Sequence, residues 1–231
     1  LSFFKRSTVL LLAAVLASAT SYTRLSTTME YGEDSTRGKS ELTNDLDNKT
    51  SGLDKDYATQ WSYGVFETMT LIIPNFHGGA SQGSLGTDSE TYNALKRNPN
   101  AKNIIKNLPL YWGEQPIVSG PTYVGAIVFF LFILGIFLVK SSMKYWLLIA
   151  TLMSILLAWG KNFMPLTEFF LEYFPGYNKF RAVSMILVIA EFTIPFLGFL
   201  ALNYFYFIKI FFFAYLVIPV ITFKLIFIIF F

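Results

Sequence analysis

Five residues in the second half of the chain have side chains suited to binding phosphate. Lys161 and Asn162 follow one apolar segment, and Asn178, Lys179 and Arg181 precede the next. Arginine binds phosphate through two parallel hydrogen bonds and lysine binds it as a point charge. An asparagine amide can bond a phosphate oxygen or a sugar hydroxyl. The pattern predicts a site for an anionic, phosphate-bearing ligand at the membrane surface, and anchoring of the cations to lipid head groups is the alternative.

One carboxylate, Glu191, lies near the middle of an apolar segment, residues 182–202. A charge at the centre of a membrane helix costs about 2.5–3.5 kcal/mol on insertion scales, so such residues often have a function. Two interpretations remain open. Glu191 acts as a proton or substrate element, or it bonds a Ser or Thr on a neighbouring helix. Pro195, one turn later, predicts a kink.

The long polar stretch of the chain contains two acids beside aromatic residues, Glu67 and Glu114, and the only histidine, His77. Each acid is interpreted either as an ordinary surface residue or as a contact to a sugar. One histidine without a cysteine does not make a zinc site, and the sequence has no triad, phosphate loop or dinucleotide fingerprint. We therefore predict no metal and no cofactor, and the catalytic residues remain unknown. For a longer protein that contains this chain, a divalent metal is an alternative.

The composition indicates an integral membrane protein. Hydrophobic residues make up 54% of the 231 residues and charged residues only 14%, whereas soluble domains have about 25% charged residues. The formal net charge is +3 and no basic stripe accompanies it, so nucleic acid is not an expected partner. Membrane lipids are the expected partners.

The chain has five apolar segments whose lengths are near the roughly 20 residues that a helix needs to cross a bilayer. They are residues 8–20 (extendable to 1–20), 120–139, 143–160, 182–202 and 205–231. We predict an all-α membrane protein with about four or five transmembrane helices. The first segment also has the features of a signal peptide, with Lys5 and Arg6 before an apolar run and small residues at its end.

These segments divide the chain into four parts. The parts are a first transmembrane helix or signal-like segment (1–20), a large extracytoplasmic loop (21–119), transmembrane helices two to four (120–202) and an apolar C-terminal segment (203–231). Lys5 and Arg6 favour a cytoplasmic N-terminus, which puts the large loop outside. Within this loop we expect strand or irregular structure at 29–42, a short helix within 44–57 and an amphiphilic segment at 61–73.

Both ends of the chain suggest a piece of a longer protein. The chain begins with leucine, and residues 203–231 are largely Phe, Ile, Tyr and Lys. That composition is typical of AT-rich DNA read out of frame, and an ordinary apolar helix is the alternative.

Several stretches, in this order, resemble one known family. They are residues 30–42, 61–64, 67–68, Leu71-Ile-Ile-Pro-Asn-Phe-His-Gly-Gly79, Tyr111-Trp-Gly-Glu-Gln-Pro116, 120–126, 160–163, 166–170 and Pro175-Gly-Tyr-Asn-Lys-Phe-Arg181. Over roughly residues 8–202 the chain is similar to the YfhO-like bacterial membrane proteins of the Bacteroidetes type, whereas residues 203–231 are not.

The resemblance implies a polytopic protein of the bacterial inner membrane. It also implies a GT-C-like glycosyltransferase, which takes a polyprenyl-phosphate-linked sugar on the outer face and serves the cell envelope. In that class the catalytic acid lies in the first external loop, upstream of this chain, so enzymatic activity of the chain alone is uncertain. The alternatives are a transporter or flippase-like protein that depends on Glu191, and a non-catalytic membrane scaffold.

Overall fold

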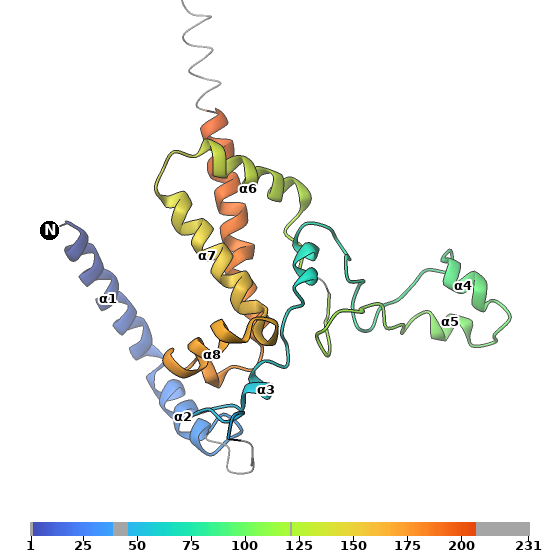
Figure 1. Ribbon diagram of the computed structural model, residues 1–231, viewed down its shortest axis with the longest axis horizontal. Coiled ribbons are helices and arrows are strands. Elements are labelled where there is room, and N and C mark those ends of the chain that lie inside the picture. The colour runs from blue at the N-terminus through green and yellow to red at the C-terminus, as the bar shows by residue number, and fades with distance from the viewer. Residues whose placement is uncertain (1, 39–45, 121, 207–231) are drawn as a thin grey trace, which may run out of the picture. The chain divides into compact units, whose positions relative to one another are not determined.

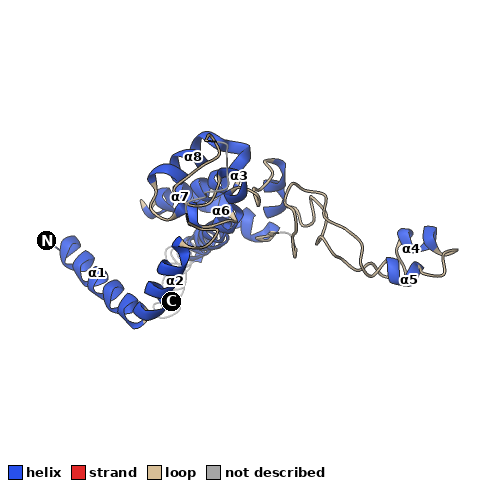
Figure 2. Cartoon of the chain, turned by 90° about the horizontal axis from the view of Figure 1, so that it is seen from below, coloured by secondary structure: helices blue, strands red, loops and turns tan. Residues whose placement is uncertain are grey.

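The computed structural model describes residues 2–38, 46–120 and 122–206 of the chain. They form two compact units. Unit one is Leu1–Thr59 with Glu168–Arg181, and unit two is Gln60–Thr167 with Ala182–Phe231. The described residues are helices and loops without a strand, apart from two isolated β-bridges (Figures 1 and 2). The all-helical prediction is therefore confirmed for this part of the chain.

The helices follow one another in this order. They are α1 (Ser2–Thr20), α2 (Tyr22–Glu33), α3 (Lys55–Ala58), η1 (Phe66–Leu71), α4 (Glu90–Leu95), α5 (Ala101–Ile104), α6 (Ala126–Leu138), α7 (Met143–Ala158), η2 (Gly160–Phe163), α8 (Met164–Tyr173), η3 (Tyr177–Lys179) and η4 (Val183–Leu187). The η elements are 3₁₀ turns, and an α-helix over residues 188–206 continues η4.

Two helical segments, Phe3–Thr20 and Val183–Tyr206, are apolar and long enough to cross a membrane, which indicates membrane association. Helix α7 and the segment Gly160–Tyr173 are bent by 112° at their junction and make a third span if the pair counts as one. The predicted four or five spans are thus not confirmed. The segment predicted at 205–231 lies largely outside the described residues.

Helix α6 is shorter than the span predicted at 120–139. It has 13 residues, which at 1.5 Å per residue cover about 20 Å of a hydrocarbon layer about 30 Å thick. Its start is fixed by Gly125, whose φ of 95° lies outside the helical region, so regular helix begins only at Ala126. The segment is apolar as predicted, but the hydropathy pattern does not show the break in the backbone at Gly125.

The prediction of strand or irregular structure at 29–42 is wrong for its first residues, since α2 extends to Glu33. The Ser and Thr side chains of α2 donate to main-chain carbonyls of the preceding turn. Thr27 Oγ1 bonds Thr23 O at 2.9 Å, and Thr28 Oγ1 bonds Arg24 O at 2.7 Å. These bonds satisfy the hydroxyl groups within the helix. A short helix does form within 44–57, where α3 begins at Lys55.

The core of unit two lies between α6, α7 and the helix at 188–206. Figure 1 shows α7 and this last helix side by side. The buried apolar residues of this core are Phe132, Val139, Ala158, Leu187, Ala190, Ile194 and Leu197, together with Tyr63 from the loop before η1. Gly135 of α6 lies against Leu197, where a Cβ would come within 2.8 Å of the Leu197 carbonyl oxygen. Small residues allow such close helix contacts.

A hydrogen bond of 2.6 Å joins Thr151 of α7 to Thr193 of the last helix, and both residues are buried. Replacing Thr193 with valine keeps the shape and removes this bond. We expect a loss of stability of about 0.6 kcal/mol and at most about 1.7 kcal/mol, as for other bonds between membrane helices. Unfolding in mixed micelles with increasing SDS measures it, with Thr193→Ser as the control. A loss in Thr193→Ser as large as that in Thr193→Val would show that packing of the methyl group, and not this bond, is what stabilises the contact.

Candidate functional site

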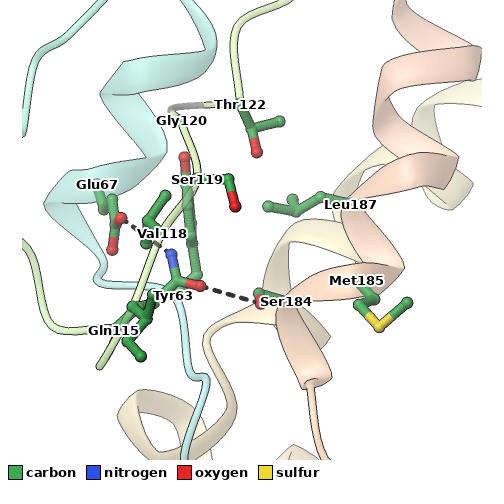
Figure 3. Close-up of a pocket in the computed structure, with 11 residues that line it drawn as sticks. Tyr63, Glu67, Gln115, Val118, Ser119, Gly120, Thr122, Ser184, Met185 and Leu187 are labelled. Carbon is green, nitrogen blue, oxygen red and sulfur yellow. Dashed lines mark hydrogen bonds between the residues drawn. The ribbon is translucent and has the colours of Figure 1, made fainter. Parts of the chain in front are cut away.

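Unit two contains a polar pocket of about 260 Å³, next to the residues where the membrane-length segment Val183–Tyr206 begins (Figure 3). Three segments of the chain line it. They contribute Tyr63 and Glu67, then Gln115, Ile117, Val118, Ser119, Gly120 and Thr122, and finally Ser184, Met185 and Leu187. Several of these side chains carry hydroxyl, amide or carboxylate groups, so the pocket presents both donors and acceptors to a ligand.

Glu67 is the only carboxylate that lines this pocket, and it is 3% exposed. Its Oε1 accepts hydrogen bonds from the Tyr111 hydroxyl at 2.7 Å and from Gln115 Nε2 at 3.0 Å. Its Oε2 accepts the Gly64 amide proton at 3.0 Å. The interpretation of Glu67 as an ordinary surface acid is therefore wrong. The 3₁₀ turn η1 directs this side chain inward, and three donors compensate for the buried charge.

The Tyr63 side chain reaches the same pocket from the loop and is 3% exposed. Its hydroxyl makes no hydrogen bond of ordinary geometry within the described residues, although the Thr70 hydroxyl lies close to it. Burial, followed by the charge of Glu67, raises the Tyr63 pKa well above its ordinary value. A buried donor without a well-formed hydrogen bond is uncommon, and the Tyr63 side chain forms part of the wall of the pocket.

Gln115 connects the loop to the beginning of the last helix. Its Oε1 accepts a hydrogen bond from Ser184 Oγ at 3.2 Å while its Nε2 donates to Glu67, as Figure 3 shows. The Ser184 amide also donates to the Trp61 carbonyl at 3.3 Å. The side-chain bonds form a chain from Tyr111 through Glu67 and Gln115 to Ser184, which fixes one wall of the pocket.

The buried Tyr63 and the half-buried Tyr111, both beside Glu67, make unit two sensitive to high pH. Burial, and then the hydrogen bond to Glu67, raises the Tyr111 pKa, and the Tyr63 pKa is raised as well. The unfolded chain ionises its tyrosines at about pH 10, so above that pH the folded state holds more protons. We expect stability that is constant below about pH 9 and falls as pH rises through 10 and beyond.

Thermal melts in detergent across this pH range test the alkaline prediction. Tyr111→Phe should be less stable at neutral pH but should lose less stability between pH 9 and 11 than the native chain. An equal alkaline loss in both proteins would contradict the assignment. In unit one, burial raises the Tyr177 pKa to about 12, so Tyr177→Phe should lessen the alkaline loss of that unit in the same way.

Two residues of the predicted phosphate site lie in unit two. Asn162 Nδ2 donates to the Tyr63 carbonyl at 3.0 Å and to Glu114 Oε2 at 2.9 Å. Lys161 Nζ is 3.9 Å from the same Glu114 oxygen, and both of those side chains are about half exposed. Glu114 is thus a surface acid that partners these two residues, a role that the sequence did not predict.

The other three residues of that predicted site lie together in unit one. Asn178 is 6% exposed, and its Nδ2 donates to Ser51 Oγ at 2.8 Å. Lys179 Nζ donates to the carbonyls of Arg37 at 2.7 Å and Ser51 at 3.0 Å. Asn178 and Lys179 therefore bind the loop residues Arg37 and Ser51.

Arg181 also has a local partner in unit one. It donates to the Tyr57 hydroxyl at 2.8 Å, and its guanidinium group lies over that ring at 5.3 Å. A common phosphate site for all five residues stays a prediction.

Glu191 is exposed on the helix at 188–206 and makes no hydrogen bond or ion pair within the described part of the chain. The bond to a neighbouring helix that was one interpretation of Glu191 is made by Thr193, two residues later. The mechanistic role of Glu191 stays a prediction.

His77 stacks on Trp112, with ring centroids 4.4 Å apart and an interplanar angle of 27°. The Trp112 amide also donates to the His77 carbonyl at 3.1 Å, which fixes the turn. Within residues 2–38, 46–120 and 122–206, no group of three or more His, Asp or Glu side chains lies close enough together to hold a metal ion.

Glu67 was predicted from the sequence as a candidate sugar contact, but its pocket partners Tyr63, Gln115 and Ser184 were not. These residues are distant in the chain and have no common motif, so only the fold brings them together. The one available signal was the concentration of aromatic and polar residues on both sides of the apolar segments. No family model, no curated protein and no solved structure matches this chain.

Proposed function

We propose that this chain is part of a multi-pass protein of the bacterial inner membrane that binds a polyprenyl-phosphate-linked sugar for cell-envelope assembly. In this proposal the pocket around Tyr63 and Glu67 takes the sugar. The single observation that carries it is the buried Tyr63 side chain, which lines a polar pocket beside an apolar helix of membrane length and whose hydroxyl has no well-formed hydrogen bond within the described residues.

The position of the pocket supports a ligand that is itself attached to the membrane. Ser184, Met185 and Leu187 line the pocket and belong to the first turns of Val183–Tyr206. A lipid that extends along this apolar helix would bring its head group to the level of these turns. The proposal puts the pocket on the outer face of the membrane, as expected from the basic residues before the first helix.

The chemistry of the pocket favours a sugar over a phosphate. Its volume of about 260 Å³ lies just below the roughly 300–1,000 Å³ typical of sites for drug-sized molecules, so the ligand group is small. Tyr63, Ser119, Thr122 and Ser184 offer hydroxyls to a ligand rich in hydroxyls. The Glu67 carboxylate would repel a phosphate, which therefore lies outside the pocket.

The test is binding of a fluorescent, short-chain polyprenyl-phosphate hexose to the full chain in nanodiscs. Tyr63→Phe removes only the Tyr63 hydroxyl, and Ser184→Ala removes the hydroxyl that bonds Gln115 Oε1. We expect each variant to bind about 5–15-fold more weakly, since one hydrogen bond contributes about 1–1.5 kcal/mol. Thr122→Val tests the outer wall, and Tyr145→Phe, in another part of unit two, is the control. Equal binding in all five proteins would overturn the proposal.

Glu191 supports a second candidate, transport of a substrate or proton without bond-forming chemistry. It is an exposed carboxylate within a membrane-length helix, where an ionisable residue is expensive unless it has a function. Transport predicts that Glu191→Gln abolishes uptake while Tyr63→Phe has no effect. The sugar-binding proposal predicts the reverse order of sensitivity in the binding assay.

A further inference from the structure

Unit two has a surface with several positive charges that does not line the pocket. The chain between Leu85 and Leu108 forms a hairpin of two short helices, α4 and α5, and is named here the basic hairpin. Its ends are paired by main-chain hydrogen bonds, from Leu85 N to Ile105 O at 2.8 Å and in both directions between Gly83 and Leu108 at 2.9 Å. Ala101 and Ile105 are buried inside it.

All the positive charge of the basic hairpin is presented to solvent. Lys96, Arg97, Lys102 and Lys106 are exposed, and none of them makes an ion pair within the described residues. The hairpin also contains two exposed acids, Asp88 and Glu90, so its net charge is +2, and from residue 91 to residue 113 the chain contains these four cations and no acid. Four unpaired cations on a small hairpin create a local positive potential, which attracts an anionic surface.

We propose that the basic hairpin docks onto the anionic phospholipid head groups of the bilayer in which the same chain is anchored. Each net positive charge close to an anionic leaflet strengthens such an association about fivefold, so the net charge of +2 gives roughly one order of magnitude or slightly more. The hairpin belongs to the same unit as the membrane-length helix, which keeps it at a high effective concentration near the bilayer.

An apolar residue accompanies the cations on α5. Ile104 lies between Lys102 and Lys106 and is 36% exposed. Basic residues with an exposed aliphatic side chain are the combination by which short amphipathic segments enter the head-group layer. The bilayer therefore fits the hairpin better than a soluble anionic polymer, which would make use of the charges alone.

The experiment uses the full chain in nanodiscs of phosphatidylcholine, with and without phosphatidylglycerol. Because the chain has no cysteine, Asn103→Cys introduces a single labelling position on α5. Energy transfer from a dye at this position to a head-group-labelled lipid reports the approach of the hairpin to the bilayer. We expect transfer to rise with phosphatidylglycerol and to fall again as salt is added, because salt screens the attraction.

Two variants with the same label isolate the role of charge. K96Q/R97Q/K102Q/K106Q removes all four cations, and K96R/R97K/K102R/K106R keeps them. We expect the phosphatidylglycerol-dependent rise to disappear in the first variant and to persist in the second. A rise that persists without the four charges overturns the proposal. The proposal is also overturned if energy transfer in the labelled chain with all four native cations does not change with phosphatidylglycerol. A label that responds only to added soluble polyglutamate has the same meaning.

Discussion

Replacing Glu67 with alanine is expected to lower the unfolding free energy of unit two by about 3–5 kcal/mol, since each buried donor left without its acceptor costs about 1–3 kcal/mol. Three donors lose their partner, namely the Tyr111 hydroxyl, the Gln115 amide and the Gly64 main-chain amide. Because Gln115 also bonds Ser184, the wall of the pocket loosens too. Tryptophan fluorescence during denaturation in detergent measures the change.

Glu67→Gln separates the charge from the acceptor. The glutamine keeps one carbonyl oxygen, so it should retain part of the stability while its amino group opposes the donors around it. Glu30→Ala, at an exposed position of α2, is the control and should change stability by less than about 0.5 kcal/mol. If Glu67→Ala were as mild as Glu30→Ala, the hydrogen-bond network around the pocket would not contribute to stability.

The second large effect is expected at Gly160, where Gly160→Ala should destabilise unit two by about 2–5 kcal/mol. Gly160 has a φ of +49°, a conformation in which other residues cost about 1–3 kcal/mol. An added Cβ would also collide with the Ser62 hydroxyl and come within 2.7 Å of Val183 Cγ2. Overpacking of this kind costs about 1–3 kcal/mol. Ser62 Oγ accepts the Lys161 amide proton at 2.8 Å, so this bond is displaced as well.

Gly176→Ala is the matched control for backbone strain. Gly176 has a φ of +80°, but nothing lies within 4 Å of the position that its Cβ would take. This variant should therefore show the strain alone, about 1 kcal/mol. Thermal melts of the two variants in detergent provide the comparison. Equal losses would mean that the contact between Gly160 and Ser62 adds nothing to the strain.

The apolar pattern of the chain predicted the positions of its membrane-length helices better than it predicted their number. Residues 143–160 and 182–202 agree closely with α7 and with Val183–Tyr206, because a long apolar run leaves the backbone little choice but a helix. The predicted number of spans is not confirmed within the described residues, because single backbone features decide where a helix begins and ends. Gly125 delays the start of α6, and Gly160, also at positive φ, lies two residues after the end of α7.

The candidate site was harder to predict, for reasons of distance along the chain and local geometry. Gln115 bonds Glu67, 48 residues away, and Ser184, 69 residues away, and no local pattern encodes such pairings. The amphiphilic segment at 61–73 contains only one 3₁₀ turn, and this turn buries Glu67. Conversely, Asn178 and Lys179 were singled out for their chemistry, but in the fold they bond the main chain and Ser51.

Photo-crosslinking to a polyprenyl-phosphate hexose with a diazirine on the sugar ring tests the central proposal most directly. The full chain in nanodiscs is irradiated with this probe, digested and examined by mass spectrometry. The account predicts labelled peptides from residues 115–122 and 184–187, which line the pocket, and loss of this labelling with unlabelled lipid-linked hexose and in Tyr63→Phe. Labelling confined to the apolar helices, or unchanged in Tyr63→Phe, would contradict it.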